Sequence, residues 1–158
     1  MLTLPSSGIV IMEYNSASPE DTDRIGKEIA QTLCGGDKVF LSGDLGMGKT
    51  TLAKAIISSF GIRENSVTSP TFSLLNVYTI EKTLRSVQVI AHIDAYRMKD
   101  ETEMQEIGAE EHLQDPHTIV ILEWPEIVPL TAKNYPHTEI VITEKEGIRT
   151  IRVKKVTF

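Results

Sequence analysis

The chain has 158 residues and a formal net charge of −6, with 41% hydrophobic and 24% charged residues. This length suits a single domain over residues 1–158, and the composition is that of a folded globular protein rather than a disordered one. Only 16 lysines and arginines stand against 22 acids, which argues against unaided binding of DNA or RNA, because such binding depends on neutralising phosphates.

Strand and helix signals alternate in the first half of the chain. The predicted elements are a strand at Ile9–Tyr14, a helix between Ser18 and Gly35, a strand at Lys38–Ser42 and a helix over Lys49–Phe60. Ser18 followed by Pro19 is typical of a helix start, and Gly61 closes the second helix. The strand at Lys38–Ser42 is an apolar run, which predicts that it is buried.

The second half of the chain contains strands that pair locally. The predicted strands are Thr71–Tyr78, Ser86–Ile93, Thr118–Leu122, Thr138–Thr143 and Ile148–Val153. Asp100 and Glu103 have the spacing of a capping box before a short helix that Gly108 ends, and Glu144–Gly147 predicts a hairpin turn. This order predicts an α/β three-layer sandwich similar to P-loop NTPases, whose mixed sheet has a parallel centre and an antiparallel C-terminal hairpin.

The glycine-rich segment between the strand at Lys38–Ser42 and the next helix matches G-x-x-x-x-G-K-[ST]. It consists of Gly43, Asp44, Leu45, Gly46, Met47, Gly48, Lys49 and Thr50, followed by Thr51. Glycines allow backbone conformations that a Cβ would block, so that successive N–H groups point at phosphate oxygens. Lys49 supplies positive charge for the β- and γ-phosphates, and the Thr50 hydroxyl is a Mg²⁺ ligand. Because a chance match is expected in fewer than roughly one in a hundred chains of this length, we expect these residues to bind ATP.

Two predicted strands end in acids. Asp94 follows Ser86–Ile93, and Glu123 follows Thr118–Leu122. Open α/β sheets bind ligands beyond the carboxyl ends of their strands, so both acids can reach a nucleotide at the glycine loop. One acid is expected to hold Mg²⁺, directly or through water, and the other to position the attacking water, and sequence position does not assign the two roles. The alternative is that either acid caps a loop.

Four further features have both a functional and a structural interpretation. The hydroxyls of Ser69–Thr71 either sense the γ-phosphate or belong to an ordinary turn. His92 lies two residues before Asp94 and either orients that carboxylate or is a core histidine. Arg97 either stabilises transferred charge or forms a surface salt bridge. Trp124 either stacks on a partner or packs within the chain.

The sequence also bears on location in the cell. No apolar run approaches the roughly 18 residues that a membrane-spanning helix requires. The segment Met1–Gly8 has no basic stretch before an apolar one, which argues against a signal peptide, and Cys34 is the only cysteine. We therefore expect a cytoplasmic protein without membrane contacts.

Several motifs together resemble the TsaE (YjeE) family, the bacterial ATPases of tRNA threonylcarbamoyladenosine (t6A) biosynthesis. The motifs are GDLGMGKTT at Gly43–Thr51, VTSPTF at Val67–Phe72, HIDAYR at His92–Arg97 and LEWPE at Leu122–Glu126. This set, in this order and at this chain length, is specific to the family and covers nearly the whole sequence.

The resemblance implies a Mg²⁺-dependent protein that binds ATP and ADP and has weak intrinsic ATPase activity stimulated by partners. The implied partners are TsaD and TsaB, with which the family is required for threonylcarbamoylation of adenosine 37 in tRNAs reading ANN codons. The implied role of ATP turnover is to reset the complex, which contacts tRNA through the partners. The acidic charge balance fits this expectation. The segments Asn15–Thr22 and Gly147–Arg149 occupy positions where the family contacts the base.

By motif position, the resemblance also implies roles for individual residues. These are phosphate and Mg²⁺ binding for Lys49 and Thr50, a second Mg²⁺-linked group at Glu123, the essential acid at Asp94, and a switch-like loop containing Thr71.

Other classes of P-loop protein remain as alternatives. A small-molecule kinase shares the loop and the size, but its lid is usually rich in arginine, and the six arginines here are scattered. A GTPase should contain an Asn-Lys-x-Asp run, which this sequence lacks. A purely structural subunit would have no use for an intact Lys49-Thr50 pair.

Overall fold

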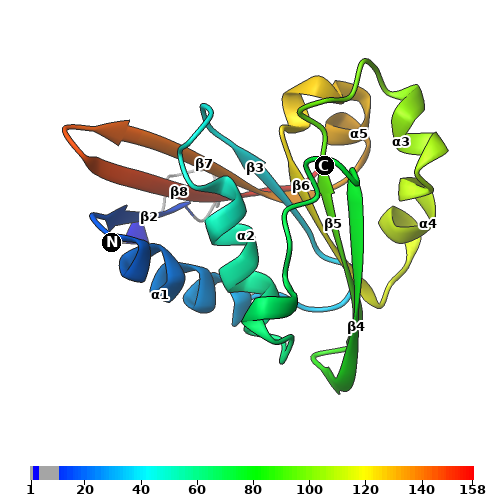
Figure 1. Cartoon of the computed structure of the whole chain (residues 1–158), viewed down its shortest axis with the longest axis horizontal. Coiled ribbons are helices and arrows are strands. Elements are labelled where there is room, and N and C mark those ends of the chain that lie inside the picture. Colours follow the sequence, from blue (N-terminus) through cyan, green and yellow to red (C-terminus); the bar gives the residue numbers. More distant parts are fainter. Residues whose placement is uncertain (1, 4–10) are drawn as a thin grey trace.

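The computed structural model describes residues 2–3 and 11–158, and the strands of this part of the chain form one eight-stranded sheet (Figure 1). The strands are β1 (Leu2–Thr3), β2 (Ile11–Ser16), β3 (Lys38–Ser42), β4 (Leu75–Leu84), β5 (Val87–Asp94), β6 (Thr118–Glu123), β7 (His137–Lys145) and β8 (Ile148–Val156). Their order is β1-β2-β8-β7-β3-β6-β5-β4. The four strands β7, β3, β6 and β5 pair in parallel, and the other pairs are antiparallel. The predicted mixed sheet with a parallel centre and an antiparallel β7–β8 hairpin is therefore confirmed.

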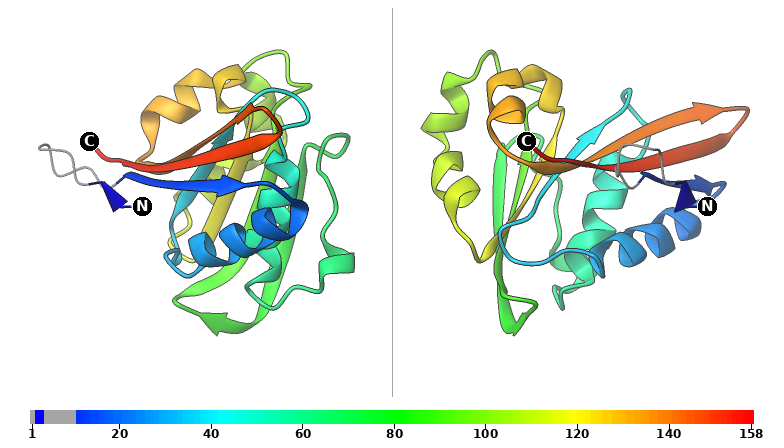
Figure 2. Two further views of the ribbon diagram at one scale, coloured as in Figure 1. Left: turned by 90° about the vertical axis from the view of Figure 1, so that its left-hand side faces the viewer. Right: turned by 180° about the vertical axis from the view of Figure 1, so that it is seen from behind.

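Helices cover both faces of the sheet (Figures 1 and 2). One face holds α1 (Pro19–Ala30) and α2 (Lys49–Ser58), and the other holds α3 (Thr102–Glu106), α4 (Ala109–Gln114) and α5 (Pro129–Asn134). The short β3 strand shows why both faces are covered. Val39 and Leu41 pack in the core beneath α1 and α2, whereas Phe40 points to the second core with Met104 and Leu113 of α3 and α4. A strand that is buried on both sides has a continuous run of apolar residues, and the burial predicted for this strand from its sequence is observed.

The strand predicted at Thr71–Tyr78 begins later than expected. Leu74 has φ of 66°, in the left-handed region, and its N–H donates to the carbonyl of Pro70 at 2.7 Å. This turn keeps Thr71 out of the strand, and β4 begins at Leu75. The start of the first predicted strand, Ile9–Val10, lies outside the described residues.

The second half contains more helices than the sequence predicts. Gly108, with φ of 75°, ends the predicted helix, but the chain then continues into α4. The helix α5 and the strand β1 were not predicted, and two short 3₁₀ turns lie at Glu64–Ser66 and Pro125–Ile127. None of the helices within residues 11–158 is long and apolar enough to span a bilayer.

Glu101, the residue before α3, links that helix to the start of α5. Its carboxylate accepts hydrogen bonds from the Leu130 N–H, from the Thr131 N–H at 3.3 Å and from the Thr131 hydroxyl at 2.8 Å. The first N–H groups of a helix have no partner within the helix, so this distant side chain satisfies the start of α5.

We expect Glu101→Ala to lower the free energy of unfolding by about 1–2 kcal/mol, because it leaves these donors without an acceptor. Urea denaturation followed by circular dichroism measures the change. Glu106→Ala is the matched control, since the Glu106 side chain is exposed and makes no hydrogen bond or ion pair with the described residues. Equal losses for the two variants would show that the Glu101 contacts are not stabilising.

Candidate functional site

A cleft of about 360 Å³ opens where β3, β5 and β6 end, beside the glycine loop that joins β3 to α2. It is lined by Leu45, Gly46, Gly48, Lys49, Thr50, Thr51, Thr71, Asp94, Tyr96, Glu123, Trp124 and Arg149. The structure therefore brings together the predicted loop, both predicted acids and Thr71. Three predicted loop residues are placed differently: the Met47 side chain packs against the core under α1 and α2, and Gly43 and Asp44 do not line the cleft.

The backbone of the loop requires its glycines. Gly46 and Gly48 have φ of 82° and 95°, which side chains rarely adopt. A Cβ on Gly48 would also lie 2.8 Å from a guanidinium nitrogen of Arg149, but that flexible side chain can move aside, so the backbone angle is what favours glycine there. Because Gly48 is the N-cap of α2 and offers no side-chain cap, the first N–H groups of this helix are left to bind an anion.

Lys49 is buried at the bottom of the cleft, with 6% of its surface exposed. Its Nζ donates to the carbonyls of Gly43 and Asp44, the second at 2.9 Å, and lies 4.0 Å from the centre of the Trp124 ring. Burial lowers the pKa of Lys49, and nearby carboxylates, Glu123 first among them, oppose that shift. The lysine thus rests against its own loop and can exchange these carbonyls for phosphate oxygens.

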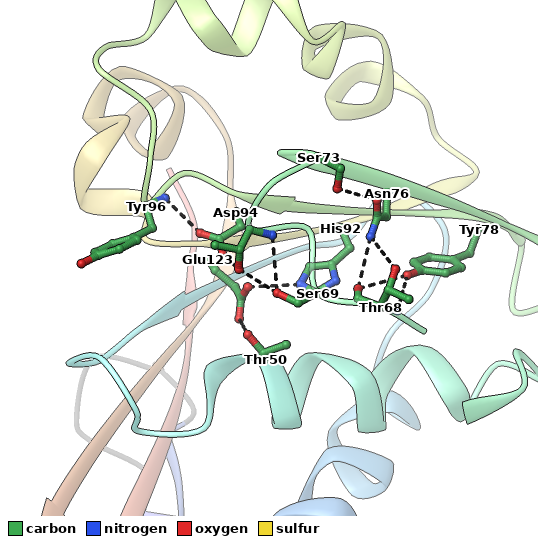
Figure 3. A network of polar contacts seen from close by, with 11 residues as sticks. Thr50, Thr68, Ser69, Ser73, Asn76, Tyr78, His92, Asp94, Tyr96 and Glu123 are labelled. Atoms are coloured by element: carbon green, nitrogen blue, oxygen red, sulfur yellow. Dashed lines mark hydrogen bonds and ion pairs between the residues drawn. The ribbon is translucent and has the colours of Figure 1, made fainter. Parts of the chain in front are cut away.

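Asp94 and Glu123 lie side by side because β5 and β6 are parallel neighbours in which these two residues are register partners (Figure 3). Glu123 Oε1 accepts from the Thr50 hydroxyl at 2.9 Å. Asp94 Oδ2 accepts from the Thr71 hydroxyl at 3.1 Å, and its Oδ1 accepts from the Tyr96 N–H at 2.9 Å. The structural interpretation of Asp94 as a loop cap is thus correct for one oxygen, while the other faces Thr71.

The loop that carries Thr71 is held at two points (Figure 3). Thr71 is held by its hydrogen bond to Asp94, and its hydroxyl lies 2.7 Å from that of Ser69. At the far end, the Asn76 amide donates to the Thr68 carbonyl at 3.2 Å, and the Tyr78 hydroxyl accepts from the Thr68 N–H at 3.1 Å. Sequence reasoning missed Asn76 and Tyr78, although two polar groups at alternate positions of one strand face were a signal that this face binds a loop.

His92 does not orient Asp94, so that interpretation is wrong. Neither ring nitrogen of His92 has a hydrogen-bond partner among the described residues. The nearest acid atom is Glu123 Oε2, 3.4 Å from His92 Nε2. On the two parallel strands His92 pairs with Ile121 and Asp94 pairs with Glu123, so the His92 ring meets the acid of β6 diagonally, through its long side chain, rather than the acid of its own strand.

Within residues 11–158, Arg97 does not form the surface salt bridge that one alternative expects, whereas Trp124 packs within the chain, as one of its alternatives expects. Arg97 makes no salt bridge with the described residues and does not line the cleft; its guanidinium lies 4.1 Å from the centre of the exposed Phe72 ring. Trp124 packs within the chain, with its ring 4.8 Å from that of Tyr96. Its φ of 60° turns the backbone sharply after β6.

Arg149 extends from β8 to the glycine loop, where it donates to the Gly46 carbonyl at 3.3 Å. It also lines a second pocket of about 120 Å³ with Ser16–Pro19, Glu144 and Gly147. The two segments expected near the base therefore meet next to the cleft.

The residues of the cleft fit a magnesium ion held mainly by water and phosphate. Glu123 directs Oε1 at the Thr50 hydroxyl, and both Oε1 and Thr50 Oγ1 keep free lone pairs, because each takes part in a single hydrogen bond with the described residues. Within residues 11–158, no three His, Cys, Asp or Glu side chains form a metal-binding cluster. Mg²⁺ commonly takes one or two protein oxygens and completes its shell with water and phosphate.

Comparison with known proteins gives a consistent set of relatives. The family model described as "Threonylcarbamoyl adenosine biosynthesis protein TsaE" matches residues 16–152. Proteins named tRNA threonylcarbamoyladenosine biosynthesis protein TsaE are similar: that of Rickettsia conorii is 40% identical over 70% of this chain, and that of Mycobacterium bovis is 35% identical over 68%. The matched regions span 59% and 64% of those relatives' own length.

A solved structure agrees with this set. The crystal structure of Bacillus subtilis YdiB superposes with a TM-score of 0.71 at 25% identity, covering 99% of this chain and 88% of that one.

Proposed function

Because the chain belongs to the TsaE family of tRNA threonylcarbamoyladenosine biosynthesis, we propose that it is a Mg²⁺-dependent ATPase that acts with TsaD and TsaB. The proposed role is in threonylcarbamoylation of adenosine 37 in tRNAs reading ANN codons, with ATP turnover resetting the complex between reactions. The observation that carries the proposal is one cleft in which the glycine loop faces two carboxylates from adjacent parallel strands.

The phosphates would bind to the N-terminal amides of α2 and to Lys49. These groups are arranged before the ligand arrives, so little reorganisation is needed on binding. Thr50 and Glu123 would hold Mg²⁺, which supplies positive charge to the β- and γ-phosphate oxygens when bound.

The hydrogen bonds favour different roles for the two acids. Glu123 contacts Thr50, which supports a role near the metal. Asp94 contacts Thr71, which supports a role in orienting the attacking water beside the γ-phosphate. Through Thr71 and Ser69, the state of the γ-phosphate would be transmitted to the loop that Asn76 and Tyr78 anchor.

The smaller pocket between Ser16–Pro19 and Gly147–Arg149 is the proposed position of the adenine base. Arg149 is shared with the larger cleft, so it lies between the two ends of the nucleotide in this proposal. The net charge of −6 supports indirect contact with tRNA, through the partners. The proposed location is the cytoplasm.

We expect the isolated chain to hydrolyse ATP slowly and a TsaD–TsaB complex to accelerate it by at least about tenfold. Arg149 is the one arginine among the described residues lining the cleft, and it is bonded to a loop carbonyl. Groups that stabilise transferred charge typically contribute 10³–10⁵ to such rates, so a partner that supplies one has a large effect. Phosphate release, measured with and without the partners, tests this.

Two outcomes would contradict the proposal. A fast rate that the partners do not change would indicate a different class of ATPase. Transfer of the γ-phosphate to a small molecule, detected with radiolabelled ATP, would indicate the kinase alternative.

A further inference from the structure

The contact between His92 and Glu123 joins a fully buried ring to a carboxylate that lines the cleft, and the proposed ATPase function gives this contact no role. The His92 side chain is 0% exposed and that of Glu123 is 1% exposed. Nε2 of the ring lies 3.4 Å from Oε2 of the carboxylate, and neither atom has a hydrogen-bond partner among residues 11–158 (Figure 3). A buried polar atom without a partner is costly, and here two of them face each other.

A histidine that only filled the core would not need this orientation. The adjacent polar side chain of β4 is Asn76, the register partner of His92, but its amide is used by Thr68 and Ser73. Glu123 therefore remains as the acceptor for the ring. Its other oxygen is already bonded to the Thr50 hydroxyl.

We propose that His92 is a positioning residue for Glu123: its Nε2–H faces Oε2 and holds the carboxylate so that Oε1 stays directed at Thr50. The 3.4 Å separation is at the long end of the hydrogen-bond range, and a small rotation of either side chain would align and shorten the contact. The catalytic consequence rests on the proposed ATPase function, in which Glu123 and Thr50 hold the metal. Groups that orient metal ligands in this way are commonly worth 10- to 100-fold in metal affinity or activity.

The contact itself is tested on the isolated chain, without nucleotide. The chain has four histidines, so long-range ¹H–¹⁵N correlation spectra of ¹⁵N-histidine-labelled protein resolve each ring, and His92→Gln identifies the signals of His92. We expect a proton on Nε2 and a shift of that signal in Glu123→Gln. A proton on Nδ1 with an unprotonated Nε2 would overturn the proposal. So would His92 ring signals that Glu123→Gln leaves unchanged.

The consequence for turnover is tested with two variants in the presence of TsaD and TsaB. We expect His92→Leu to reduce kcat by about tenfold or more and to raise the Mg²⁺ concentration for half-maximal rate by a similar factor. KM for ATP should change less than about threefold, because the glycine loop binds the phosphates. His92→Gln, whose amide nitrogen lies near the position of Nε2, should restore most of the rate.

Equal impairment of His92→Leu and His92→Gln would overturn the positioning role, and so would a Leu variant with the parent's turnover and Mg²⁺ dependence. Failure of the proposed function is distinguishable, because the parent protein itself would then hydrolyse no ATP with its partners. The spectra of the isolated chain test the His92–Glu123 contact in either case.

Discussion

Lys49→Ala is expected to weaken ATP binding at least about a hundredfold while the fold survives. The ammonium group is buried beside the N-terminus of α2 and is held by two loop carbonyls, which phosphate oxygens would replace. A hydrogen bond to a charged group contributes about 1.5–3 kcal/mol, and 1.4 kcal/mol corresponds to tenfold in affinity. Titration calorimetry with ATP and Mg²⁺ measures the affinity, and circular dichroism reports the fold.

Lys54→Ala is the matched control for this experiment. Lys54 lies on the same helix, α2, but lines a different pocket with Glu20, Asp23 and Glu64. Its removal should leave ATP affinity within about twofold of the parent. If Lys49→Ala binds ATP as tightly as the parent, the phosphate site is not at this loop.

Glu123→Ala and Asp94→Ala should each keep ATP affinity within an order of magnitude and reduce partner-stimulated turnover by about 10²–10³-fold. Binding is expected to persist because the loop amides and Lys49 remain. Turnover is expected to fall because each acid contacts a hydroxyl, Thr50 or Thr71, that faces the cleft. Steady-state phosphate release, measured at several Mg²⁺ concentrations, checks both parts.

The Mg²⁺ dependence separates the roles of the two acids. High Mg²⁺ should partly restore Glu123→Ala, whose defect lies in metal binding, and should not restore Asp94→Ala. Glu111→Ala serves as control, because Glu111 is exposed on α4, away from the cleft. Normal hydrolysis by both active-site variants with partners present would exclude these acids from the site.

Local sequence determines the parts of this site that could be predicted. The glycine loop depends on residues adjacent in sequence, so its position between β3 and α2 follows from the motif and its flanking elements. Asp94 and Glu123 could be identified because each follows a buried strand, and parallel strands end at the same edge of a sheet. The same reasoning gives the central sheet and its C-terminal hairpin.

Contacts between distant segments determine the parts of the structure that could not be predicted from the sequence. The partner of His92 depends on the register of β5 against β6, which periodicity does not specify. The start of α5 depends on Glu101, 29 residues away along the chain. The late start of β4 depends on the left-handed backbone of Leu74, a conformation that leucine rarely adopts and that the sequence therefore does not indicate at this position.

The position of Trp124 has a practical consequence. It is the only tryptophan in the chain, and its ring faces the ammonium group of Lys49 at 4.0 Å. Indole emission responds to nearby charge, so a lysine that moves from the loop carbonyls to an incoming phosphate should change both its intensity and its wavelength. The protein thus contains an intrinsic fluorescent reporter of nucleotide entry, suitable for stopped-flow kinetics without any added dye.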